Sequence, residues 1–154
     1  MFWGPNEDGG RGYPEELAAF IAERSADQPA VLWPRSDLPP DHENLGQLLA
    51  GRLTQYLVSE VSPVLVVPTD GATDPLHPQV DLLVIQTAGS STVMVGHPGG
   101  TEQRPMATRA WGIRLRRGEV LFLPREWIGT LHPEDGTRYV LLQIAARPGA
   151  KPDR

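Results

Sequence analysis

The sequence predicts one mainly β domain with two helices ahead of its strands. Three observations predict this class. Glycine and proline number 16 each among the 154 residues, as suits many short strands joined by turns. Hydrophobic residues make up 40% of the chain, which is enough to form a core. The spacing of apolar residues changes from helical to alternating near Pro63.

Two helices are expected before this change. Pro14 and two glutamates suit a first helical turn, where proline loses no hydrogen bond and acids favour the helix dipole. Apolar residues follow at helical spacing: Leu17, Phe20 and Ile21. Asn44 can cap the second helix. Gly51 can end that helix early, so its length stays open. One face of that helix is apolar: Leu45, Leu48, Leu49 and Leu53.

The expected strands are short and turn-bounded. They cover residues 30–33, 64–67, 81–86, 92–95, 111–115, 120–123 and 139–145. In 111–115 apolar residues alternate with polar ones, so Arg114 should point outward. We expect a barrel or sandwich with the helices packed outside. Its domain should span 13–147, between flexible ends at 1–12 and 148–154.

Charge and composition exclude several functions. The net charge of −5 disfavours nucleic-acid binding. The absence of cysteine excludes disulfides and thiolate metal sites. No apolar run approaches the ~20 residues that a membrane span needs, and the first residues lack the pattern of a signal peptide. We therefore expect a cytoplasmic protein that binds neither nucleic acid nor membrane.

Two segments resemble the core motifs of the cupin superfamily, and more narrowly of Jumonji-C-like, 2-oxoglutarate oxygenase-like barrels. They are residues 77–89 and 118–127, the second continuing to His132 and 139–144. The resemblance covers residues 14–146 and implies a single double-stranded β-helix barrel. In this family a His-x-Asp pair and a later histidine hold iron, and a basic residue anchors the cosubstrate.

The chain departs from the family pattern at each part of this site. After His77, the position of the aspartate is taken by Gln79. The third ligand would fall on Gly129, with His132 three residues late, and Ser91 stands where a cation would hold the cosubstrate. These departures predict a degenerate site, with no metal and no cofactor expected.

A metal-binding alternative stays open. If a metal is present, its ligands would be His77, Asp81 and His132, and the cofactors would be Fe(II) and 2-oxoglutarate. The other interpretations are a strand-end acid bonded to backbone for Asp81 and a turn residue for His132.

Five residues are expected to bind a ligand whether or not a metal is present. They are Gln86, Arg109, Trp111, Trp127 and His132. Residues 104–117 hold five arginines and no acid, so they can hold a carboxylate substrate or an acidic partner. Arg109 is the best single candidate. A solvated strand face is the alternative for the arginines, and ordinary core is the alternative for Trp111 and Phe122.

The resemblance implies a metal-poor Jumonji-like cupin that binds a small molecule or peptide. A non-oxidative tailoring step in a biosynthetic pathway, such as cyclisation or isomerisation, is the reaction it implies. Two alternatives stay open: an Fe(II)/2-oxoglutarate-dependent hydroxylase and a non-catalytic structural or regulatory module. The resemblance also implies that a second copy of the chain can bind through a sheet edge to form a homodimer.

Overall fold

The mainly β class with two early helices is confirmed. The computed structural model describes residues 12–23, 28–40, 44–57, 60–64, 76, 80–96, 111–134 and 136–145. Its elements are α1 (Tyr13–Glu23), β1 (Ala30–Leu32), α2 (Leu45–Tyr56), β2 (Val61–Val64), β3 (Asp81–Ala88), β4 (Ser91–Gly96), β5 (Trp111–Leu115), β6 (Val120–Leu123), β7 (Ile128–Pro133) and β8 (Arg138–Ile144). Within these ranges, neither helix is long and apolar enough to cross a membrane.

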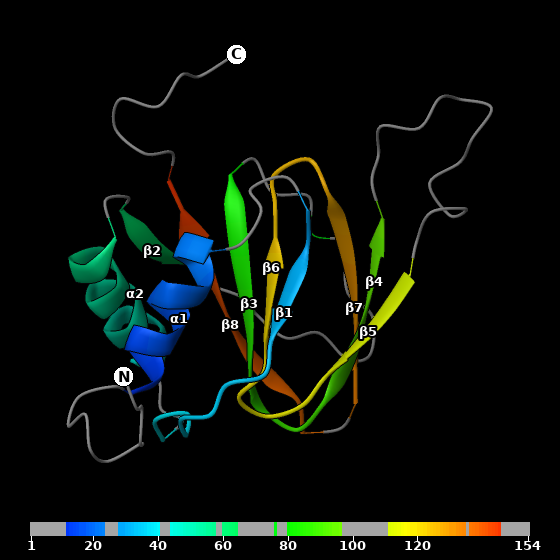
Figure 1. The fold of residues 1–154 in the computed structure, drawn as a ribbon. Coiled ribbons are helices and arrows are strands. Elements are labelled where there is room, and N and C mark those ends of the chain that lie inside the picture. Colours follow the sequence, from blue (N-terminus) through cyan, green and yellow to red (C-terminus); the bar gives the residue numbers. More distant parts are fainter. Residues whose placement is uncertain are drawn as a thin grey trace.

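The strands form two antiparallel sheets that face each other. One has the order β1-β6-β3-β8-β2, and the other has the order β5-β4-β7. The chain changes sheet between β3 and β4, between β5 and β6, and on either side of β7. Figure 1 shows both helices on the outer side of the five-stranded sheet, which leaves the three-stranded sheet at the far side of the molecule.

The alternation along β3 separates two apolar layers. Leu83 and Ile85 face the helices and pack in a cluster with Phe122 and Leu142. Leu82 and Val84 face the second sheet, in a cluster with members such as Val93, Leu115, Leu121 and Leu131. Both faces of β3 are therefore buried, which explains why its sequence is a nearly continuous apolar run.

Several element boundaries differ from the prediction. The helix α2 continues through Gly51 to Tyr56, and Asn44 stands at its N-cap without a side-chain capping hydrogen bond. Leu48 is 43% exposed, because the buried stripe of α2 includes Ala50 and leaves Leu48 at its margin. Residues 65–67 of the expected strand, and all of the termini expected to be flexible except Gly12, lie outside the described residues.

The prediction missed β7. This strand pairs with β4 along its length, from Ser91 opposite Pro133 to Gly96 opposite Ile128. Its inward positions include Gly129, so the sequence offers little apolar alternation by which to recognise it. The interpretation of His132 as a turn residue is wrong, because His132 lies within β7.

A buried hydrogen bond joins the first helix to the barrel. Tyr13 is 2% exposed, and its hydroxyl donates to the carbonyl oxygen of Gly118 at 2.7 Å. Burial raises the pKa of this phenol, with a smaller contribution from Glu16. The Glu16 carboxylate accepts from the backbone N–H groups of Arg35 and Ser36 at 2.7 and 2.9 Å. Side chains of α1 thus bond to two separate loops, one that contains Gly118 and one that contains residues 35–36.

Tyr13→Phe is expected to lower the free energy of unfolding by about 1–2 kcal/mol, because it leaves a buried carbonyl without its donor. Urea denaturation measures the change. Tyr56→Phe is the matched control, since the Tyr56 hydroxyl bonds to Glu15 on an exposed surface. A loss as large in Tyr56→Phe would mean that burial of the Tyr13 bond contributes nothing.

Candidate functional site

One end of the two facing sheets carries positions at which the resemblance implied a metal site. We call it the site end and define it by Leu76, Asp81, Trp127 and Gly129. Leu76 and Gly129 exchange two backbone hydrogen bonds, of 2.6 and 2.9 Å between nitrogen and oxygen. Leu76 directly precedes the first motif in the sequence, and this bridge places Leu76 itself against Gly129, the expected third-ligand position.

The third-ligand position is closely packed. Gly129 is buried on the inner side of β7. A Cβ atom added there would lie 3.2 Å from Cδ2 of Leu123 and 3.5 Å from Cγ1 of Val93. Aliphatic side chains therefore already fill the space into which a ligand side chain at this position would project.

The alternative ligands Asp81 and His132 are not brought together. Asp81 begins β3 and pairs with Ile144. His132 pairs with Thr92, close to the turn that follows the other end of β3. It is exposed and lies on the outer face of β7, because it is three residues from the inward-facing Gly129. His77 lies outside the described residues, and those residues hold no group of three or more potential metal ligands.

Asp81 instead holds a turn at the site end. Its Oδ1 accepts from the backbone N–H of Arg125 at 3.1 Å. That turn is closed by a 3.1 Å bond from the N–H of Trp127 to the carbonyl of Pro124. This is the strand-end bonding to backbone that the sequence left as one interpretation of Asp81. The same turn contains Glu126 with a φ of 78°, a left-handed conformation that side chains other than glycine rarely adopt.

Glu126→Gly is expected to raise the free energy of unfolding by about 0.5–1 kcal/mol, because glycine adopts this left-handed conformation without a Cβ clash. Urea denaturation of the variant and of Glu126→Ala measures it. Alanine keeps the Cβ and should give no gain. An equal gain in both variants would assign the effect to the lost carboxylate.

The opposite end of the barrel holds a buried polar pair. We call it the turn end and define it by residues 89–90, 116–119, 134 and 136–137. Gln86 and Ser91 are both 0% exposed. Ser91 donates from Oγ to Oε1 of Gln86 at 2.7 Å, and Nε2 of Gln86 donates to the carbonyl of Ala88 at 2.7 Å. The polar atoms of this pair are therefore hydrogen-bonded within the protein, and Ser91 occupies the position at which the resemblance implied a cation.

The candidate ligand residues fall at both ends. Trp127 packs at the site end against the apolar cluster between the two sheets, which we call the inter-sheet cluster. The backbone of Trp111 pairs with Val95 toward the same end. Gln86 and His132 belong to the turn end. Phe122 is in the helix-facing cluster, so it is ordinary core and cannot line the space between the sheets. Arg109 lies outside the described residues.

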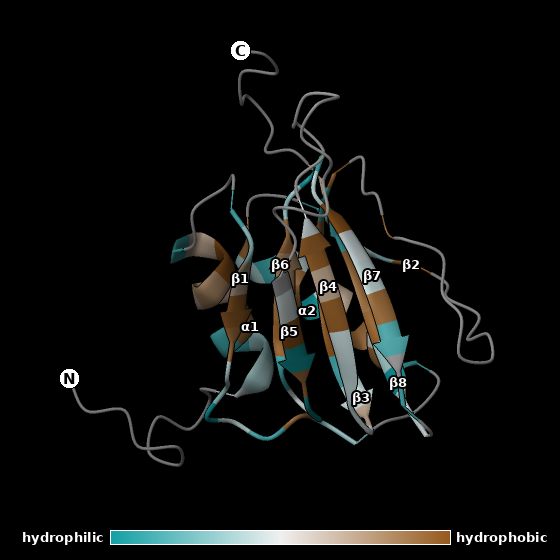
Figure 2. Cartoon of the chain, turned by 90° about the vertical axis from the view of Figure 1, so that its right-hand side faces the viewer, coloured by the Kyte–Doolittle hydropathy of each residue, from teal (hydrophilic) through white to brown (hydrophobic). Residues whose placement is uncertain are grey.

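Sequence reasoning missed a polar network on the turn end. Arg114 points outward, as predicted, and forms a 3.2 Å ion pair with Glu134. Ser90 donates to Glu134 at 2.8 Å, and Thr137 donates to the Ser90 carbonyl at 2.5 Å. Figure 2 shows hydrophilic residues gathered at the lower ends of β5 and β7. The sequence indicated only the outward direction of Arg114. The residues that bond to it lie in other turns, which no local pattern connects with β5.

Tyr139 is a further residue that the sequence did not single out as functional. It pairs with Gln86 across β3 and β8, and it is half-buried against the inter-sheet cluster. Desolvation by burial raises the pKa of its phenol. Through its pairing with Gln86, Tyr139 stands next to one member of the Gln86–Ser91 pair in the sheet.

Comparisons with known proteins give weak likenesses. No family model matches the chain, and no curated protein matches it significantly. A number of solved structures show partial similarity, among them the following three. Hydroquinone 1,2-dioxygenase from Sphingomonas sp. TTNP3 is 16% identical with a TM-score of 0.40, covering 58% of this chain and 59% of that one. Protein NMB1881 from Neisseria meningitidis is 13% identical with a TM-score of 0.37, covering 84% and 95%.

The third is the CENP-C cumin domain from Drosophila melanogaster, which is 12% identical with a TM-score of 0.39, covering 71% of this chain and 88% of that one. The chain thus spans less than two thirds of the length of the dioxygenase. Similarity at these levels carries no conclusion about activity.

Proposed function

We propose that the chain is a metal-independent, cupin-type double-stranded β-helix barrel that binds a small molecule or peptide. The strand order supports the barrel type. With the Leu76 bridge counted beside β7, β2-β8-β3-β6 faces a second row of Leu76-β7-β4-β5, and β1 is added at one edge. With the Leu76 bridge in the place of a fourth strand, this order matches the two four-stranded sheets of a jelly roll, to which cupins belong.

The packing of Gly129 carries the proposal of metal independence. The position that should supply the third ligand has no side chain, and its surroundings are aliphatic. The nearest histidine along the strand, His132, faces outward. The described residues therefore do not fit Fe(II) with 2-oxoglutarate, and we assign no oxidative step to them. We propose instead a role in binding, with a non-oxidative tailoring step as the reaction.

The second candidate is a non-catalytic structural or regulatory module. The observation that favours it is the lining of the space between the sheets. Described side chains there are almost entirely aliphatic and fully buried, including Val84, Val93, Leu115 and Leu121. The polar exceptions include Gln86 and Ser91, which bond to each other, and the half-buried Tyr139. A homodimer and a cytoplasmic location remain predictions for either function.

The melting temperature of chelator-treated protein tests the proposal, because any molecule that binds the folded state raises it. We expect a rise with members of a panel of small molecules and peptides in metal-free buffer. We expect no rise with Mn(II) plus 2-oxoglutarate. A rise that requires both metal and 2-oxoglutarate would support the hydroxylase. No rise with any compound would favour the non-catalytic module.

A further inference from the structure

We propose that the β5–β6 turn at the turn end, residues 116–119, is a docking surface for an acidic peptide segment of a partner protein. Arg116 and Arg117 are the groups that would bind it. The inference rests on the proposed role in binding and names the partner class. It concerns the end of the barrel opposite Gly129.

The turn is held rigidly from the inside. The N–H of Gly118 donates to the Gln86 carbonyl at 2.7 Å, and the N–H of Gln86 donates to the Glu119 carbonyl at 3.0 Å. The Tyr13 hydroxyl bonds to the Gly118 carbonyl at 2.7 Å. These bonds fix the turn backbone before any partner arrives. Binding therefore costs less conformational entropy than it would on a mobile loop.

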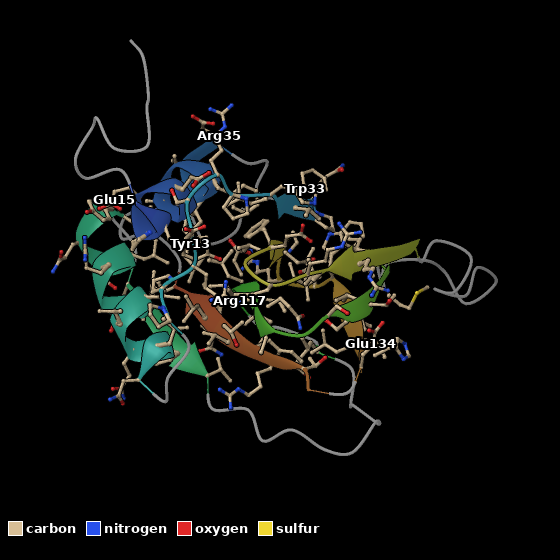
Figure 3. All side chains as sticks on the ribbon, turned by 90° about the horizontal axis from the view of Figure 1, so that it is seen from below. Tyr13, Glu15, Trp33, Arg35, Arg117 and Glu134 are labelled. Carbon is tan, nitrogen blue, oxygen red and sulfur yellow. The ribbon has the colours of Figure 1, made fainter. Side chains whose placement is uncertain are left out.

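Arg116 and Arg117 are exposed, and no acidic side chain among the described residues pairs with either guanidinium group. Within the described parts of the chain, neither guanidinium makes a hydrogen bond or ion pair. The adjacent Glu119 accepts the backbone N–H of Arg116 at 2.8 Å, so it closes the turn. Figure 3 shows Arg117 near the middle of this face, whereas Glu134 lies toward its edge. Glu134 pairs with Arg114.

Within the described residues of this face, four arginines, Arg114, Arg116, Arg117 and Arg138, outnumber two acids, Glu119 and Glu134. Arg114 and Arg138 flank the neighbouring hairpin, opposite Thr92 and Ala88. The charge of the whole chain is −5, so this face opposes the overall charge of the molecule. A local basic face of this size suits carboxylates spaced along a peptide. It is too small for the long basic stripe typical of nucleic-acid binding.

An extended acidic peptide fits better than a single small anion. An exposed ion pair changes an equilibrium constant by at most about fivefold, since water screens it. One small carboxylate would therefore bind very weakly. A segment with several glutamates can contact both guanidinium groups at once, and each contact multiplies the affinity.

Fluorescence anisotropy with a labelled octaglutamate peptide tests this inference. The variant is Arg116→Gln/Arg117→Gln. The matched control is Arg35→Gln/Arg125→Gln, which removes the same charge from exposed arginines elsewhere. We expect the variant to bind about five- to twenty-fivefold more weakly at low salt, and the control to bind less than about twofold more weakly. Binding should fall as NaCl rises from about 20 to about 200 mM.

The other outcomes overturn the inference. Equal weakening in the two double variants would show binding to general charge, and absence of peptide binding to the wild type would exclude the surface. Competition by succinate at the same carboxylate concentration would assign a small-anion site. Preference for a single-stranded oligonucleotide would assign a nucleic-acid surface. Circular dichroism of both variants checks that the fold is kept. None of these outcomes alters the melting-temperature result with metal and 2-oxoglutarate.

Discussion

Gly89→Ala is expected to lower the free energy of unfolding by about 3 kcal/mol. Gly89 has a φ of +67°, and an added Cβ would lie 3.0 Å from both the carbonyl oxygen of Gly136 and Cα of Thr137. The left-handed conformation costs an alanine about 1–2 kcal/mol, and a contact with backbone on the facing turn adds about 1–3 kcal/mol. Urea denaturation followed by circular dichroism measures the sum.

Gly136→Ala provides the control for this prediction. Gly136 has a φ of +76°, but an added Cβ would meet nothing within 4 Å. We expect a loss of only about 1–2 kcal/mol there, from the backbone conformation alone. Losses of equal size at the two positions would mean that the β3–β4 turn can move away from residues 136–137. The close contact between these turns would then contribute nothing to stability.

Gly129→His is expected to lower the free energy of unfolding by about 2 kcal/mol without creating a metal site. The imidazole has to displace Leu123 and Val93, and overpacking of this kind typically costs about 1–3 kcal/mol. Urea denaturation measures the stability, and calorimetric titration with Zn(II) measures the binding.

Gly112→His is the matched control, since Gly112 is exposed on the outer face and an added Cβ there meets chiefly the flexible Met94. It should change stability by less than about 0.5 kcal/mol, as surface substitutions usually do. A stable Gly129→His protein that binds Zn(II) tightly would show that the site lacks only this one ligand. The proposal that aliphatic packing has replaced the site would then fail.

The sequence predicted those features that depend on local pattern. Alternation of apolar and polar residues predicted β5 and the outward direction of Arg114, and the departure at Gly129 could be counted from Gly118 and Pro124. Features that depend on pairing between distant segments could not be predicted. The bond between Asp81 and the N–H of Arg125 spans 44 residues.

The turn end shows the same limit. Gln86 and Ser91 meet only because the β3–β4 hairpin sets their register, and no local pattern indicates that their side chains bond. The turn that carries Arg116 and Arg117 is held by a hydrogen bond from Tyr13 to Gly118, which are 105 residues apart in the sequence. Propensity and spacing do not determine such contacts, because tertiary packing decides them.

Elemental analysis of the purified protein tests the central claim, that this barrel acts without metal, most directly. Protein made in medium containing iron, zinc and manganese should carry far less than one metal ion per chain. His77→Ala should leave that content unchanged, because the expected third-ligand position, Gly129, has no side chain and a single histidine holds a divalent cation poorly against water. About one metal ion per chain that is lost in His77→Ala would contradict the claim.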